Sequence, residues 1–275
     1  MDYSPRRLSY VFLCLVPVLA IGFAGVRALR IPGVYTIIGA ALFLPTAMAV
    51  WTLGARAVRS GTEANQRLAF AGGFLIVPFA LVALFWVGLG PPWVATPPEN
   101  VMRYLVLLVS SIAVTIGFVV LKEALGEAGE RSYSTLGFAA AMLAGCAYLL
   151  WMCFLIGECV ANVRDGKVPP TIAALSDVLE ILLDVACLLT YLATTAFAAS
   201  FGRARWIGRG ATRAYVALNL IALLCLVVRG VSFQNPVAAT AWYTQPGFVV
   251  GIPAIPFIMP FLLGVVLLWR AAREE

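Results

Sequence analysis

The sequence contains no histidine, and this absence removes several classes of site at once. Histidine-ligated haem, histidine-containing zinc or di-iron centres and histidine acid–base catalysis all need a side chain that the chain lacks. Lysine is nearly absent too, since Lys122 and Lys167 are the two in the chain and both are expected at helix ends. A retinal Schiff base, which needs a lysine inside the membrane, is therefore not expected.

Charged residues are scarce as well, at 12% of the 275 residues against about 25% in an average soluble domain. Hydrophobic residues make up 62%, and the mean hydropathy is +0.96. Apolar runs of about 20 residues recur along the chain, and each can cross a hydrocarbon layer of roughly 30 Å as a helix. The six cysteines lie inside these runs without a C-x-x-C pair, which argues against a disulfide framework and against a thiolate metal site.

Hydropathy predicts an all-α protein, a polytopic integral membrane bundle of about eight transmembrane helices in a single membrane domain, residues 1–275. The expected spans are 9–29, 34–54, 69–89, 103–121, 136–163, 177–200, 214–233 and 248–269. The connections are short, so no separate soluble domain is expected. The segments 46–60 and 194–208 share small residues, a glycine and arginines in similar order, which raises the hypothesis of two parallel repeats of four helices.

The positions of Lys and Arg predict how the helices are oriented. With both termini in the cytoplasm, thirteen of the nineteen Lys and Arg residues fall on the cytoplasmic side and six on the outer side. This asymmetry follows the positive-inside rule and is typical of a bacterial-type cytoplasmic (inner) membrane. The arginines are spread over several loops without a basic helix, so the net charge of +6 gives no reason to expect nucleic acid as a partner.

The 177–200 span differs from the others because it carries a stripe of polar residues. The stripe consists of Asp177, Glu180, Asp184, Cys187, Tyr191, Thr194 and Thr195. At 100° per residue these positions fall within an arc of roughly 100° on an α-helix. Two acids at up to about 3 kcal/mol each nearly cancel the favourable insertion free energy of the apolar residues in this span. We therefore expect the helix to turn Glu180 and Asp184 towards the bundle interior.

Two further ionisable residues are expected near the same depth, in the outer half of the membrane. They are Glu158 in the 136–163 span and Arg229 in the 214–233 span. Acids inside a membrane are hypotheses of function by default, so we predict a binding pocket formed by Glu158, Glu180, Asp184, Tyr191 and Arg229. A purely structural interpretation stays open, in which Glu158 and Arg229 reach the interface and the acids hold helices together.

Two other patterns concern helix packing. The last span contains GIPAIPFIMP, in which Pro253, Pro256 and Pro260 remove three backbone donors within eight residues. This predicts a break or a kink, and a broken helix at membrane depth must be buried or line a cavity, so the segment is a candidate wall of the pocket. Small residues at four-residue spacing, Gly137 to Gly145, predict close packing of the 136–163 helix.

Three classes of function fit these patterns. A transporter or channel-like protein would move a proton, a cation or an amphipathic small molecule past Glu180 and Asp184. The alternative is a sensory module or an accessory subunit that docks on other membrane subunits. A membrane-embedded enzyme is the third, because acid-rich helices bind Mg²⁺ in membrane transferases, but the chain lacks their second acidic motif and we expect no enzyme. The lipid bilayer is the expected partner in every case.

Overall fold

The computed structural model describes residues 3–25, 34–89, 95–232 and 254–273, and in this part of the chain it forms nine helices. They are α1 (Tyr3–Gly25), α2 (Val34–Ser60), α3 (Glu63–Leu89), α4 (Pro97–Glu127), α5 (Ser132–Asp165), α6 (Pro170–Ala173), α7 (Ser176–Arg203), α8 (Arg209–Ser232) and α9 (Ala254–Arg273). The all-α prediction is confirmed. Eight of the nine helices have 20 residues or more, and each overlaps one predicted span.

Within the described residues, six helices are long and apolar enough to cross a membrane: α2, α3, α4, α5, α7 and α8. Many large apolar side chains on these helices point outwards, among them Met48, Leu143 and Ile181. So much exposed apolar surface is unfavourable in water and suits contact with lipid. The structure thus supports a multi-pass membrane protein, and the spans at α1 and α9 stay predictions.

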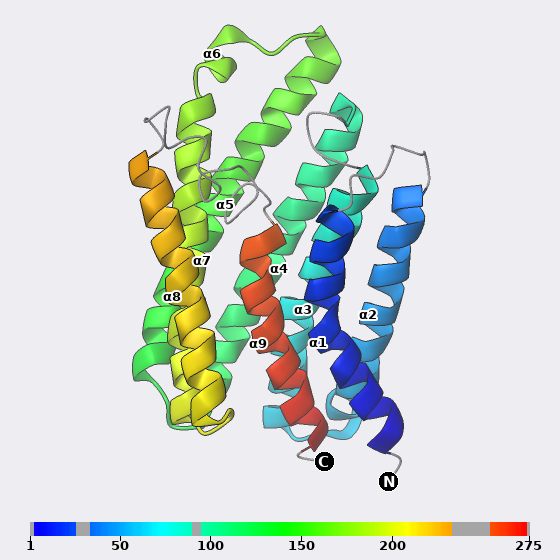
Figure 1. Cartoon of the computed structure of the whole chain (residues 1–275), viewed down its shortest axis with the longest axis vertical. Coiled ribbons are helices and arrows are strands. Elements are labelled where there is room, and N and C mark those ends of the chain that lie inside the picture. The colour runs from blue at the N-terminus through cyan, green and yellow to red at the C-terminus, as the bar shows by residue number, and fades with distance from the viewer. Residues whose placement is uncertain (1–2, 26–33, 90–94, 233–253, 274–275) are drawn as a thin grey trace.

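The long helices run alternately up and down. Figure 1 shows that α1 begins and α9 ends at the same end of the bundle, which is also the end of the α2–α3, α4–α5 and α7–α8 turns. The start of α1 and the end of α9 therefore lie on one side of the bundle. Which side of a membrane that is stays a prediction.

The C-terminal helix α9 returns to the first half of the bundle and packs against α3, α2, α1 and α7. Its closest approach is to α3, where Gly72 and Gly264 face each other. A Cβ added to Gly264 would lie 2.9 Å from the carbonyl oxygen of Gly72, so the two backbones touch. Two turns along α3 and one turn along α9, the rings of Phe79 and Phe261 are 4.9 Å apart. The absence of side chains at both glycines is what lets α9 enter the bundle.

The second half of the bundle is a row in which α4 packs on α5, α5 on α7, and α7 on α8. The predicted small-residue face of α5 makes the close contacts: a Cβ on Gly137 would lie 2.9 Å from Phe197 Cδ2 on α7, and one on Gly145 would lie 2.5 Å from Thr115 Oγ1 on α4. The packing interpretation of these glycines is confirmed.

The helix α4 begins six residues before the predicted span. Thr96 precedes it, and the Glu99 carboxylate accepts hydrogen bonds from the backbone N–H of Thr96 at 2.7 Å and from its hydroxyl at 2.9 Å. Pro97, the first helical residue, suits a position whose N–H needs no partner. Hydropathy alone places the start of the span at Arg103, because it depends on charge and carries no information about backbone hydrogen bonds.

The helix α9 begins at Ala254, so Pro256 falls in its first turn and Pro260 lies inside it. A proline in the first turn costs little, because the N–H groups there have no helical acceptor. The predicted break at Pro253 lies outside the described residues. From Ala254 onwards α9 is one helix.

Candidate functional site

The polar face of α7 points to the bundle interior from Cys187 onwards. Cys187, Tyr191, Thr194 and Ser200 are buried, and Tyr191 is 2% exposed. The opposite face is apolar and exposed: Val178, Ile181, Val185 and Leu192. Three members of the predicted stripe, Cys187, Tyr191 and Thr194, thus face the interior, in agreement with the high cost of turning polar groups to lipid. The inward turn of the two acids, Glu180 and Asp184, stays a prediction.

The structure describes the side chains of only some of the residues that were predicted to form the binding pocket. Asp184 and Glu158 are half-buried, on α7 and α5, and these two helices pack together. The side chains of Glu180 and Arg229 lie outside the described residues. The shared pocket of these residues with Tyr191 stays a prediction.

Below Asp184, the first interior contact of α7 is with α5. The Tyr148 hydroxyl lies 3.5 Å from Cys187 Sγ, at hydrogen-bonding distance for sulfur. Both side chains are buried. One turn further, the Thr190 hydroxyl donates to the Ala186 carbonyl at 2.8 Å. These groups place polar atoms in the middle of an otherwise apolar bundle.

A second interior contact joins α7 to α8. The Thr194 hydroxyl lies 2.6 Å from Asn219 Oδ1 and 2.9 Å from the Thr190 carbonyl, and both side chains are fully buried. Asn219 in turn donates from Nδ2 to the Tyr215 carbonyl at 2.9 Å, and the Tyr215 hydroxyl donates to the Met259 carbonyl of α9. Hydrogen bonds thus join α7 to α8 and α8 to α9.

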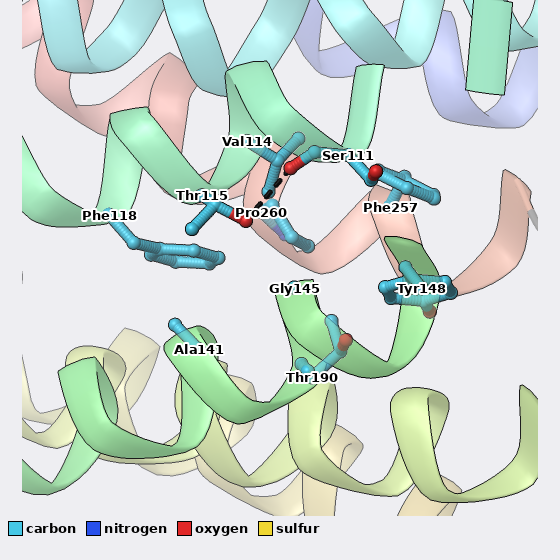
Figure 2. A pocket seen from close by; sticks show the side chains of 11 residues that line it. Ser111, Val114, Thr115, Phe118, Ala141, Gly145, Tyr148, Thr190, Phe257 and Pro260 are labelled. Carbon is cyan, nitrogen blue, oxygen red and sulfur yellow. Dashed lines mark hydrogen bonds between the residues drawn. The ribbon is translucent and has the colours of Figure 1, made fainter. Parts of the chain in front are cut away.

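A small cavity lies where α4, α5, α7 and α9 meet. Figure 2 shows Ser111 and Thr115 of α4 facing Gly145 of α5, with Thr190 of α7 at the other side. Pro260 of α9 forms part of the wall, so the proline-containing segment does line a cavity, although one at the centre of the bundle. The centre of a water molecule can move within about 20 Å³ of this cavity, so the cavity has room for about one water.

Aromatic rings close the bundle below this cavity. Phe118 of α4 and Phe197 of α7 are stacked, with ring centroids 5.0 Å apart and an interplanar angle of 6°. Phe201 lies one turn further along α7, and both Phe197 and Phe201 are 0% exposed. Along α7, the Phe197 ring falls between Thr194 and Ser200.

The C-terminal end of α7 faces a buried carboxylate in the α4–α5 turn. Glu130 is 5% exposed, and its oxygens accept the backbone N–H groups of Tyr133 at 3.2 Å and Ser134 at 3.1 Å, which caps α5. Arg203 Nε lies 3.9 Å from the carboxylate. Burial tends to raise the pKa of Glu130, but the nearby Ser200 hydroxyl, the two N–H groups and Arg203 together outweigh it and hold the pKa below its ordinary value.

The most deeply buried arginine of the described residues, Arg103, was not among the site residues predicted from the sequence. Arg103 is 0% exposed and lies six residues, about 9 Å, inside α4. Its electrostatic neighbours include Glu99, Tyr104 and Cys159, and Glu158 in turn interacts with Tyr104 and Cys159. The T-P-P-E signature of residues 96–99 was the available signal, because it places the helix start ahead of Arg103.

The described arrangement is a series of polar groups along one buried helix face. In this part of the chain no group of three or more Cys, Asp or Glu side chains is placed to hold a metal ion. Hydroxyl, thiol, amide and carboxyl groups spaced about one helical turn apart can pass protons or order water.

The long apolar helices, the apolar outer surface and the polar interior define the class: a multi-pass α-helical membrane protein. Comparison with protein-family models, with curated proteins and with solved structures finds no match.

Proposed function

We propose that this protein moves protons across a membrane along the buried polar face of α7. The observation that carries the proposal is the burial of the polar side chains of Cys187, Thr190, Tyr191, Thr194 and Ser200 on α7, with the half-buried Asp184 at one end of the series. This stretch of 16 residues extends about 24 Å, most of a hydrocarbon core of roughly 30 Å. Glu130 supplies a second carboxyl group at its inner end.

The size of the central cavity favours protons over other ions. Its space for about one water is too small for a hydrated metal cation. A proton can instead move between neighbouring hydroxyl groups and a single water. Ser111, Thr115 and Thr190 supply such hydroxyl groups around the cavity.

The stacked rings of Phe118 and Phe197 mark where the route is closed. Phe197 lies between Thr194 and Ser200 along α7, and no polar side chain of α7 falls between Thr195 and Ser200. Movement of the Phe197 ring would connect the polar groups near Thr194 with those near Ser200. The structure therefore corresponds, under this proposal, to a closed conformation.

The experiment is proton flux in liposomes that contain the purified protein and a trapped pH-sensitive dye. The wild type should exceed empty liposomes under an imposed pH gradient. Thr194→Val should lower this flux, because it removes the hydroxyl that contacts Asn219. Thr52→Val is the matched control, since the Thr52 hydroxyl also bonds the carbonyl four residues earlier but is exposed on α2. Equal loss in both variants, or no flux in the wild type, would reject the proposal.

An accessory-subunit role is the second candidate, and α8 favours it. Among the described helices α8 packs substantially only on α7, and just 11% of its apolar span is buried. Leu220, Ile221 and Leu224 point outwards from it. Such a helix can dock on another membrane subunit. Absence of flux together with a defined complex of fixed stoichiometry would favour this role over transport.

A further inference from the structure

The helix α8 carries a row of exposed residues that begins with two arginines and continues with apolar side chains. Its members are Arg209, Arg213, Ala217, Leu220 and Leu224. At 100° per residue these positions fall within an arc of about 80°, so they form one stripe, the α8 stripe. Figure 1 shows α8 at the edge of the bundle, and among the described helices it packs mainly on α7. The α8 stripe therefore faces away from the described bundle.

The two arginines of the α8 stripe, Arg209 and Arg213, have no ion-pair partner among the described residues. The sequence contains no Asp or Glu over residues 185–273, so α8 itself offers no carboxylate. The nearby Glu130 faces Arg203 instead. Side chains one helical turn apart have Cβ atoms about 5 to 6 Å from each other, so one anion can reach both guanidinium groups. Arginine often binds phosphate through two parallel N–H···O bonds.

The apolar part of the α8 stripe has the length of one membrane leaflet. From Arg213 to Leu224 the helix rises about 16 Å, and half of a hydrocarbon core measures roughly 15 Å. Leu220 and Leu224 are 49% and 60% exposed. The small side chain of Ala217 lets an acyl chain lie close to the helix backbone. The α8 stripe thus offers two cations at one end and an apolar track of leaflet length beside them.

A tryptophan marks the depth of the two arginines. Trp206 lies three residues before Arg209, in the turn between α7 and α8. Its ring centroid is 5.2 Å from that of Phe201 and 5.0 Å from the guanidinium carbon of Arg270, so its position is fixed by both neighbours. Tryptophan is enriched where lipid headgroups meet hydrocarbon. This places Arg209 at the level of the headgroups and Leu224 among the acyl chains.

We infer that the α8 stripe binds an anionic phospholipid, with its phosphate at Arg209 and Arg213 and one acyl chain along the apolar part of the stripe. Phosphatidylcholine fits the apolar part but brings a positive trimethylammonium group to two cations. A soluble phosphate fits the arginines but leaves the apolar part uncovered. The inference does not depend on the proposed transport, because the α8 stripe and the buried face of α7 share no residue.

Native mass spectrometry of the full-length protein, released from detergent micelles, can compare phosphatidylglycerol with phosphatidylcholine of the same acyl chains. Each arginine near a membrane surface contributes about a fivefold factor in affinity for anionic lipid, so phosphatidylglycerol should bind about 25-fold more tightly. The stripe variant, Arg209→Gln with Arg213→Gln, should lose this preference. The control variant, Arg56→Gln with Arg131→Gln, removes the same charge from exposed arginines at the same end of the bundle and should keep it. An equal loss in both variants would overturn the inference and reduce the effect to general charge attraction.

Two further measurements separate the lipid from other occupants. In nanodiscs, phosphatidylglycerol with a diazirine on its acyl chain should crosslink to residues 217–224 in the wild type and much less in the stripe variant. Glycerol 3-phosphate, which carries the anion without the chains, should not displace the lipid even in large excess. Displacement by glycerol 3-phosphate would overturn the inference and assign the arginines to a soluble anion. Unchanged lipid preference and crosslinking in the stripe variant would overturn it and leave the α8 stripe to a partner subunit.

Discussion

Replacing Gly137 by alanine tests the contact that holds α5 against α7. The added Cβ would lie 2.9 Å from Phe197 Cδ2 and 3.2 Å from the Ala193 carbonyl oxygen. Carbon atoms in good contact are about 3.5 to 4.0 Å apart. The Phe197 ring cannot turn away freely, because it is stacked on Phe118. The two helices must therefore separate by several tenths of an ångström.

Two effects of opposite sign set the magnitude. Overpacking of this kind costs about 1 to 3 kcal/mol of unfolding free energy. Alanine in place of glycine inside a helix stabilises by up to about 1 kcal/mol. Gly157 on the same helix isolates the second effect, since a Cβ there meets no atom within 4 Å. Gly137→Ala should therefore be less stable than Gly157→Ala by about 1 to 3 kcal/mol.

Reversible unfolding in mixed micelles, followed by far-ultraviolet circular dichroism during titration with sodium dodecyl sulfate, measures the difference. The expected order of stability is Gly157→Ala, then wild type, then Gly137→Ala. If Gly137→Ala gained as much stability as Gly157→Ala, the close approach of α5 and α7 would be wrong. The inward orientation of the α7 polar face would then lose its main packing support.

Two further predictions concern buried charges. Glu130→Gln should destabilise the protein by about 1 to 2 kcal/mol at neutral pH, since it weakens the cap of α5. Folding lowers the pKa of Glu130, so this stabilisation is present above the ordinary carboxyl pKa of about 4.3 and should vanish as the pH falls through the pKa of the folded state. Thermal unfolding of both proteins at several pH values measures the difference. Arg103→Met should cost about 3 kcal/mol, since it removes the buried cation that interacts with the Glu99 carboxylate, whereas Arg164→Met at the exposed end of α5 should cost less than about 0.5 kcal/mol. Similar losses in both arginine variants would show that Arg103 is not buried as described.

The long helices and the direction of the α7 polar face could be predicted from the sequence for a physical reason. Both follow from local periodicity: apolar runs of membrane length, and polar residues such as Cys187, Tyr191 and Thr194 that recur once per turn. A lone helix with such a stripe has only one favourable orientation in a bundle. The same reasoning identified Gly137 and Gly145 as packing positions.

The partners of that face could not be predicted, because they come from other helices. Nothing in the local pattern of Asn219 pairs it with Thr194, and nothing near Phe118 stacks it on Phe197. The return of α9 to α3 depends on Gly72 and Gly264, which are far apart in the chain. Such contacts depend on how helices pack, and hydropathy carries no information about packing partners.

Proton flux through Asp184→Asn in liposomes tests the central claim most directly. The amide keeps the shape of the side chain and removes its exchangeable carboxyl proton, so flux should fall to the level of empty liposomes while the unfolding free energy changes by about 1 kcal/mol or less. Asp165→Asn, at the exposed end of α5, should keep the wild-type flux. Wild-type flux in Asp184→Asn would contradict the proton route along α7.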